Sequence, residues 1–488
     1  MTTLRRALIF SFFESYLGVL LNLVSFVLLA RMLTPAQVGL FSVAMAIISI
    51  TQVIRDFGLV NFLIQKEQLT DDHVSTAWAL ALIFGFTLFT LVQLGAHLVG
   101  NFYADDSLTG IARVVAINFL ILPFNSVCLA LLRRSLNFPT VMRINLSAAF
   151  LSTIATLAMA WMGAGAYALA FGAVFNNAIV ALGLLVVGAA KKLLKPRLIV
   201  WREILGFGGP LTVANAITSA SMDINDLAVG KILGFQSVAI ISRAQGIMLL
   251  FHRDFMLAMR NVAYPAFSQA NRDGESMDAK FVLSVTNVGA IAWTFYGFAA
   301  IFSLEVLRLM FGPQWDASAA LVPWFCLAGA VNTLTSFVPT VMLAGGNSRL
   351  VAITELVFQP SRALIMVAVT IYFRDLLTFA IGFALVSIAS LPYYYALKQR
   401  CIPTDFGALT RGLVKDGQVA LFSLAPSLFV VFMSRTSGQA LAYPLFFACA
   451  GATCCAWLLA LRLFRHPLYD EFLTVLRSRF KRKGDLPV

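Results

Sequence analysis

The chain has 488 residues, of which 60% are hydrophobic and only 12% are charged, and its mean hydropathy is +0.85. Soluble domains are roughly 45–50% apolar and about 25% charged, so this composition excludes a water-soluble protein. The net charge of +13 does not indicate a nucleic-acid partner, because the Lys and Arg residues occupy short segments between apolar stretches.

Apolar stretches recur along the whole chain, and a helix of roughly 20 such residues crosses the hydrocarbon core of a bilayer. They predict an all-α polytopic membrane protein with about 14 spans, the first of which is uncleaved despite its resemblance to a signal peptide. In chain order the predicted spans are 8–30, 38–64, 74–100, 108–131, 144–163, 166–189, 205–229, 238–264, 281–307, 317–343, 350–373, 376–397, 417–434 and 439–461.

Basic residues fall mainly on one side of the predicted membrane. Alternate connections and the two ends of the chain carry 25 Lys and Arg residues, whereas the opposite connections carry five. The positive-inside rule therefore predicts that both termini are cytoplasmic. The segment His466–Lys483 places Leu468, Phe472, Leu476 and Phe480 four apart and ends in a basic cluster, which predicts a helix on an anionic inner leaflet.

Two short motifs occur once in each half of the chain. Ala30–Ala44 is similar to Gly230–Ala244 at an offset of 200 residues, and Arg55-Asp56-Phe57 matches Arg253-Asp254-Phe255 at an offset of 198. Six predicted spans separate the copies, so the halves enter the membrane in the same direction and are related by an axis along its normal. Such halves enclose a cavity that opens to one side at a time, which is the arrangement of a transporter.

The repeat also predicts the domain organisation. Residues 1–196 and 197–400 are expected to form two six-helix lobes, 401–463 two additional transmembrane helices, and 464–488 a basic amphipathic tail. No connection on the outer side is long enough to hold a catalytic domain, so the sequence does not predict an enzyme.

Several motifs, taken in order, resemble those of one family of transporters. They are Ala30-Arg31-Met32-Leu33-Thr34-Pro35, Arg55-Asp56-Phe57-Gly58-Leu59 running into Gln65-Lys66, Arg133-Arg134-Ser135-Leu136-Asn137-Phe138, Tyr264-Pro265-Ala266-Phe267 and Phe311-Gly312-Pro313-Gln314-Trp315. At these residues the chain resembles the polysaccharide-transport branch of the MOP superfamily, which includes Wzx-type flippases and, more distantly, MATE drug exporters. The resemblance covers nearly the whole chain.

The resemblance implies two lobes in a V, with spans 1, 2, 7 and 8 bordering the cavity. It implies a flippase that moves undecaprenyl-diphosphate-linked oligosaccharide across the bacterial inner membrane for lipopolysaccharide or exopolysaccharide biosynthesis. Its expected partners are this substrate, membrane lipids, and a polysaccharide polymerase with chain-length machinery, and not nucleic acid. A MATE-like cation-coupled multidrug antiporter is the alternative.

No cofactor is expected. The sequence has no P-loop, and its six cysteines and four histidines show no metal-ligand spacing. Energy would then come from coupling to H⁺ or Na⁺, or from downhill removal of the product.

Basic residues within the predicted spans are candidate functional residues, because charges in lipid are costly and normally face a cavity or a partner. Arg55-Asp56 and Arg253-Asp254 are expected near the cytoplasmic mouth. There they would close a gate or bind the pyrophosphate, or they would merely reach the interface and make ordinary ion pairs. The remaining basic candidates, expected to be buried, are Arg113, Arg243 and Arg362.

Acidic and small residues supply the candidates for cavity lining or ion coupling. Glu14, Gly18, Asn22 and Ser25 form one stripe along span 1, which suits either a cavity wall with a proton or cation site or plain helix packing.

Two further positions in later spans carry carboxylates. Asp223 and Asp226 share a helical face, and they are interpreted as an ion-coupling pair or as an interfacial cap. Glu355 is expected to pair with Arg362 across Pro360 or with other helices. The glycine-rich run 206–210 predicts a weak or broken helix.

Overall fold

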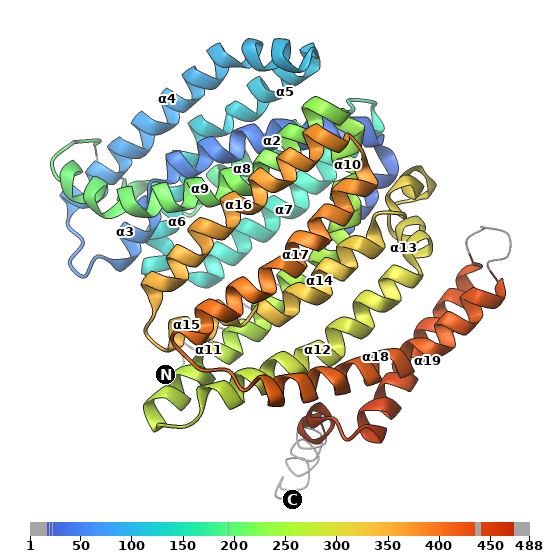
Figure 1. The fold of residues 1–488 in the computed structure, drawn as a ribbon. Coiled ribbons are helices and arrows are strands. Elements are labelled where there is room, and N and C mark those ends of the chain that lie inside the picture. The colour runs from blue at the N-terminus through green and yellow to red at the C-terminus, as the bar shows by residue number, and fades with distance from the viewer. Residues whose placement is uncertain (1–16, 19, 22, 194, 435–440, 473–488) are drawn as a thin grey trace, which may run out of the picture. The chain divides into compact units, whose positions relative to one another are not determined.

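The computed structural model describes residues 17–472 apart from 19, 22, 194 and 435–440. In this part of the chain the regular elements are helices, and no strand is present (Figure 1). The chain packs as two compact units: unit 1 comprises residues 1–239 and 359–374, and unit 2 comprises 240–358 and 375–488. The lobes expected at 1–196 and 197–400 stay a prediction.

Unit 1 contains a short apolar helix over Leu23–Met32 ahead of its longer helices. Its elements are α2 (Pro35–Asp56), α3 (Leu59–Gln65), α4 (Asp71–Tyr103), α5 (Asp106–Ala116), α6 (Asn118–Arg134), α7 (Phe138–Trp161), α8 (Ala166–Val186), η1 (Ala189–Lys192) and α9 (Trp201–Leu233). Its main core cluster packs α3, α4 and α6 around Phe62, Leu80 and Val127.

The Thr34-Pro35 motif explains where α2 starts. Thr34 is the N-cap: its hydroxyl accepts a hydrogen bond from the Gln37 amide (3.3 Å), and the Gln37 side chain accepts one from the Thr34 amide (3.0 Å). This capping box satisfies two of the amide groups that a helix start leaves open, and Pro35 suits the first helical position because its φ is already helical.

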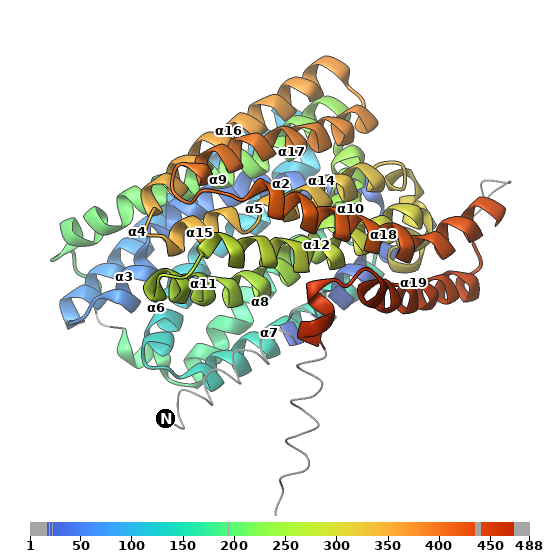
Figure 2. The same cartoon turned by 60° about the horizontal axis from the view of Figure 1, so that its bottom comes forward.

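The remaining elements are α10 (Phe235–Leu249), η2 (Leu250–Phe255), α11 (Met256–Asp273), α12 (Met277–Ile301), α13 (Ser303–Met310), η3 (Pro313–Ser318), α14 (Val322–Thr335), α15 (Val338–Ala344), α16 (Ser348–Phe373), α17 (Leu376–Gln399), α18 (Phe406–Ser434) and α19 (Tyr443–Leu463). They belong to unit 2, except for residues 235–239 of α10 and 359–373 of α16, which belong to unit 1. The helices α12, α18 and α19 lie side by side (Figure 2).

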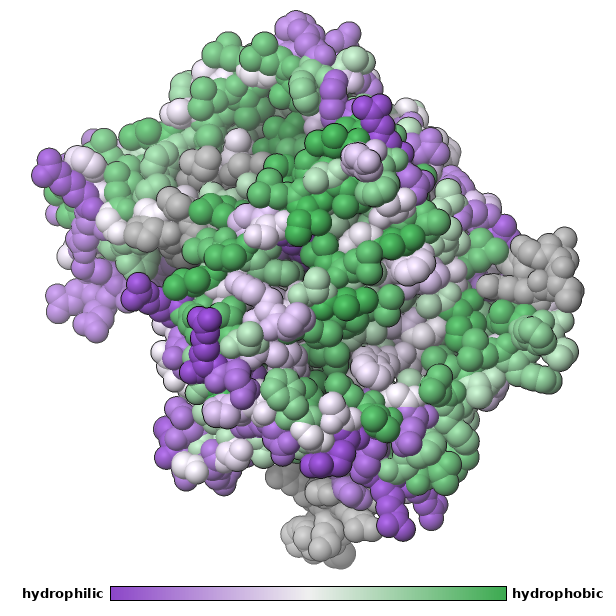
Figure 3. Space-filling view, viewed as in Figure 1, coloured by the Kyte–Doolittle hydropathy of each residue, from purple (hydrophilic) through white to green (hydrophobic). Residues whose placement is uncertain are grey.

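Ten helices of the described residues are long and apolar enough to span a membrane, and they correspond to predicted spans 3–6 and 9–14. Their outer faces carry exposed apolar side chains such as Phe86, Leu94 and Leu98 on α4. Figure 3 shows hydrophobic surface over α4 and over the α18–α19 hairpin, with hydrophilic residues gathered toward helix ends. The protein is therefore a multi-pass membrane protein, and the total of 14 spans stays a prediction.

Two local expectations are corrected. The predicted span 38–64 is interrupted, because Phe57 (φ 33°) and Gly58 (φ 67°) adopt left-handed conformations that end α2 and start α3. The glycine-rich run 206–210 does not break its helix, since α9 continues from Trp201 to Leu233.

Candidate functional site

In unit 1 the helices α2 and α9 pack along each other. Their approach is close enough to require glycine. A Cβ added at Gly208 of α9 would lie 2.0 Å from the carbonyl oxygen of Phe57, and one added at Gly39 of α2 would lie 1.7 Å from the carbonyl oxygen of Phe235, the first residue of α10. The glycines thus hold backbone against backbone, in the manner of helix interfaces built from small residues.

Arg55 lies in the last turn of α2, directly before the left-handed turn, and only 8% of it is exposed. A cation at this position interacts favourably with the carbonyl end of the helix. The turn after it is held by Gly208 against α9 and by Phe57 against Phe84 of α4, with the ring centroids 5.3 Å apart. The side chain of Asp56 lies outside the described set.

Two carboxylates lie on α9, and one of them contacts α2. Asp223 accepts hydrogen bonds from the hydroxyl of Ser49 on α2 and from that of Ser219 (3.3 Å). Asp226 is one turn further along and close enough for the two charges to repel. Ser49 precedes Arg55 by six residues, or about 9 Å of helix. The helix that contacts Asp223 through the Ser49 hydroxyl therefore also carries a cation, Arg55, at its end.

Sequence reasoning did not identify Ser49 or Ser219. The signal that was available is that Ser219 lies one turn before Asp223 on the same helical face. Glu14 and Asn22, the expected polar residues of span 1, lie outside the described residues.

The second copy of the motif lies on a π-helical segment. η2 covers Leu250–Phe255 between α10 and α11, and the Arg253 side chain on it is exposed, whereas that of Asp254 is not described. The segment is packed by aromatic rings, with Phe251 stacked 5.4 Å from Phe295. π-Helical turns inside α-helices are uncommon and occur frequently at functional sites.

The other basic candidates have three different environments. Arg243 in unit 2 is buried, with its guanidinium 4.7 Å from the Trp315 ring centroid and 5.3 Å from that of Phe311. The Phe311–Trp315 motif therefore packs around a buried cation. Arg113 is exposed on α5, so the expectation that it is buried is wrong. Arg362 is half-buried in α16.

Glu355 interacts with other helices of unit 2. Its carboxylate accepts a hydrogen bond from the Tyr394 hydroxyl of α17 (3.1 Å) and lies within electrostatic range of Arg260 on α11. This carboxylate therefore contributes to interhelical packing at the start of α16.

A polar cluster at one end of unit 1 explains two of the sequence motifs. Arg134 donates to the carbonyls of Leu63 (2.9 Å), Ile64 (3.1 Å) and Glu67 (3.0 Å), which closes the end of α3. Lys66 binds Glu203 at the start of α9. This bond lowers the pKa of Glu203, as does a weaker one from the neighbouring His73.

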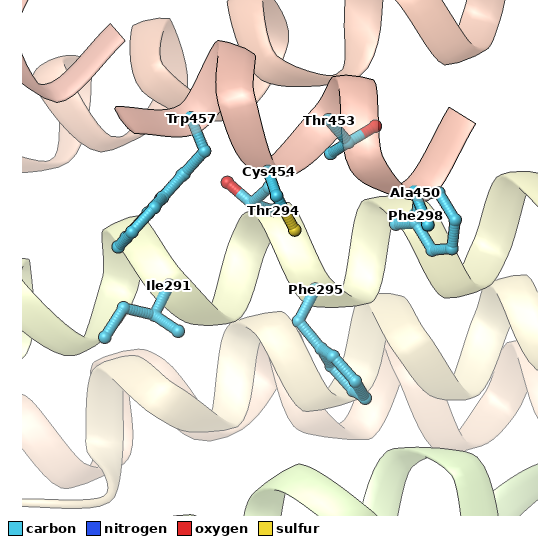
Figure 4. Close-up of a pocket in the computed structure, with 8 residues that line it drawn as sticks. All are labelled: Ile291, Thr294, Phe295, Phe298, Ala450, Thr453, Cys454 and Trp457. Atoms are coloured by element: carbon cyan, nitrogen blue, oxygen red, sulfur yellow. The ribbon is translucent and has the colours of Figure 1, made fainter. Parts of the chain in front are cut away.

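An apolar pocket of about 270 Å³ lies between α12 and α19 in unit 2. Figure 4 shows Trp457 and Cys454 of α19 facing Ile291 and Phe295 of α12. None of its lining residues is charged, so it has nothing to bind a diphosphate and suits a hydrocarbon chain.

Comparisons with known proteins relate the chain to polysaccharide biosynthesis proteins. The family model described as "Polysaccharide biosynthesis protein" matches residues 28–320. The chain is 23% identical to the lipopolysaccharide biosynthesis protein WzxC of Escherichia coli over 66% of each chain. It is 22% identical to the teichuronic acid biosynthesis protein TuaB of Bacillus subtilis over 96% of this chain and 95% of TuaB.

Two solved structures share the fold. The lipid II flippase MurJ in an inward closed conformation superposes with a TM-score of 0.73 at 12% identity, over 96% of this chain and 100% of MurJ. An inward-facing MATE multidrug transporter of the MOP superfamily superposes with a TM-score of 0.59 at 16% identity, over 79% of this chain and 95% of the transporter. The fold is therefore that of the MurJ and MATE transporters.

Proposed function

Because the chain belongs to the polysaccharide biosynthesis protein family, we propose that it is a flippase for lipid-linked oligosaccharides. Its substrate would be an undecaprenyl-diphosphate carrying a saccharide repeat unit, moved from the inner to the outer leaflet for surface polysaccharide biosynthesis. The observation that carries this proposal is the relationship to TuaB, which runs along nearly the whole chain and not along one motif alone.

The charges of the α2–α9 pair support the same function. The sugar and diphosphate need a polar path through the bilayer, while the polyprenyl tail stays in lipid. Arg55 is buried at the end of α2, and Asp223 and Asp226 lie on the neighbouring helix. Arginine binds phosphate oxygens with two parallel hydrogen bonds, so Arg55 and its counterpart Arg253 are proposed to bind the diphosphate or to close the passage behind it.

The acidic pair is proposed to couple transport to H⁺ or Na⁺. Two carboxylates one turn apart in an apolar helix repel each other unless a cation or proton lies between them. Binding or release of that cation would change the hydrogen bond that Asp223 accepts from Ser49 of α2, and this change is proposed to accompany opening and closing of the cavity.

The remaining parts of the proposal concern arrangement and location. We propose 14 spans in two six-helix lobes followed by two helices, in the bacterial inner membrane with both termini in the cytoplasm. The protein would act beside a polysaccharide polymerase and chain-length machinery and would catalyse no covalent reaction.

The acidic pair also favours a second function, the export of an organic cation by a MATE-like mechanism. Asp223 and Asp226 would then bind the cation itself. The two functions differ in the sign of the substrate charge, so the arginines separate them: an exporter of cations does not need Arg55 and Arg253.

The test replaces the two motif arginines together. The R55A/R253A variant should lose surface polysaccharide while remaining in the membrane at the wild-type level. The matched control is R143A/R272A, which removes one exposed arginine from each unit and should export normally. Wild-type export from a stable R55A/R253A variant would overturn the assigned role of these arginines.

A further inference from the structure

A second pocket, which is partly polar, lies in unit 2 where α12 and α18 begin. The proposed transport mechanism does not use it. It has a volume of about 470 Å³, and its walls include Val282 of α12 and Arg411 and Lys415 of α18. The two helices are in close contact at the pocket, since a Cβ added at Gly412 of α18 would lie 2.1 Å from a methyl carbon of Thr286 of α12.

The two acidic residues at the pocket are already engaged by the protein. Asp278 accepts hydrogen bonds from the buried ammonium of Lys398 (2.6 Å) and from the amide of Asp405 (2.8 Å). The Asp405 carboxylate in turn accepts the Ala408 amide (2.9 Å) at the start of α18. Both negative charges are therefore compensated by a cation or by a helix start.

The basic residues at the pocket lack such compensation. Arg411 makes no hydrogen bond or ion pair within the described part of the chain, and its side chain is exposed. Lys415, one turn further along α18, donates only to a carbonyl oxygen, that of Arg465 (3.4 Å).

A buried hydrogen bond fixes the segment that carries Arg465. Nε2 of His466 lies 2.8 Å from Oδ1 of Asp416, and both side chains are fully buried. The Leu468 amide donates to Nδ1 of the same ring (3.2 Å), so Nε2 carries the proton and donates it to Asp416. This bond holds Arg465 and the wall residue Pro467 against α18.

Part of the pocket wall is apolar. Val282 and the partly exposed Leu283 line it from α12, and Ala408 lines it from α18. Cations next to apolar side chains at the end of transmembrane helices can bind the headgroup phosphate and the first part of the acyl chains of an anionic lipid.

We propose that this pocket binds an anionic phospholipid of the bilayer. Arg411 and Lys415 bind the headgroup phosphate, and the apolar part of the wall contacts the first part of the acyl chains. The inference depends on membrane insertion alone and is independent of the substrate that the protein transports.

The experiment measures lipid retention on the purified full-length protein by native mass spectrometry, with phosphatidylglycerol or phosphatidylethanolamine added. Wild type should retain phosphatidylglycerol preferentially. The R411Q/K415Q variant should bind it roughly 25-fold more weakly, because each cation near an anionic lipid contributes about fivefold to affinity.

The controls separate charge from packing. The charge-preserving variant R411K/K415R and the variant R349Q, which changes an exposed arginine away from the pocket, should both bind like wild type. Equal retention of both lipids by wild type, or unchanged binding by R411Q/K415Q, would overturn the proposal. Displacement of the lipid by excess inorganic phosphate would also overturn the proposal, because the site would then bind free phosphate. Displacement by a polyprenyl diphosphate that binds more tightly than the lipid would overturn it as well, because the site would then bind the transported substrate.

Discussion

Gly208 and Gly206 lie two residues apart on α9, but only Gly208 touches another segment. A Cβ at Gly206 would meet nothing within 4 Å, whereas one at Gly208 would lie 2.0 Å from the backbone oxygen of Phe57. Ordinary contact begins at 3.4 Å, so G208A would have to move the turn after Arg55 away from α9 by about 1.4 Å. The overlapping atom is a backbone oxygen, so it cannot rotate aside as the end of a flexible side chain could.

Such overpacking typically costs about 1–3 kcal/mol. Both substitutions gain up to about 1 kcal/mol of helix propensity, so the difference between G208A and G206A isolates the overlap. For a unit of this size about 1 kcal/mol shifts the melting temperature by roughly 2–4 °C. We expect G208A to melt several degrees below G206A in detergent and to export less polysaccharide, since the displaced turn directly follows Arg55. Equal melting temperatures for the two variants would refute the close approach of α2 and α9.

Three further predictions concern residues outside the α2–α9 pair. R134A leaves three carbonyls at the end of α3 without their donor and should lose about 1–3 kcal/mol of stability in a melting assay; a wild-type melting temperature would exclude this role. W315A removes a fully buried ring beside Arg243 and should cost about 3–5 kcal/mol, so a loss below about 1 kcal/mol would contradict the packing described. The bond from Lys66 lowers the pKa of Glu203, so its stabilisation is present above the ordinary pKa of 4.5 and disappears as pH falls through the lower folded value. E203Q should therefore flatten the acid side of a plot of melting temperature against pH, and an unchanged curve would show that this ion pair does not contribute.

The sequence was sufficient for the ten helices of the described residues that are long and apolar enough to cross a membrane, because the length of their apolar runs is set by bilayer thickness. It was less informative about backbone conformation within a span. The left-handed turn at Phe57 is unfavourable for a residue with a side chain, and it forms because α9 packs on it through Gly208. The glycine-rich run 206–210 predicts a weak or broken helix, whereas α9 is continuous there and Gly208 serves close packing.

For the candidate site, too, the sequence indicated individual residues but not their contacts. Charges in spans indicated which residues to consider, and Asp223 and Asp226 do share a face. The sequence did not show that Ser49 binds Asp223, since the two residues are 174 positions apart. Nor did it indicate the pairing of Asp416 with His466, because contacts between distant helices depend on packing angles that no local pattern encodes.

The central proposal is that the protein carries a lipid-linked oligosaccharide across a bilayer. The direct measurement reconstitutes the purified protein in liposomes that contain a polyprenyl-diphosphate oligosaccharide and follows when the sugar becomes accessible to a glycosidase on the other side. We predict transfer with wild type and with R143A/R272A, and little with R55A/R253A. Liposomes in which wild type moves no oligosaccharide but exports an organic cation would contradict the account.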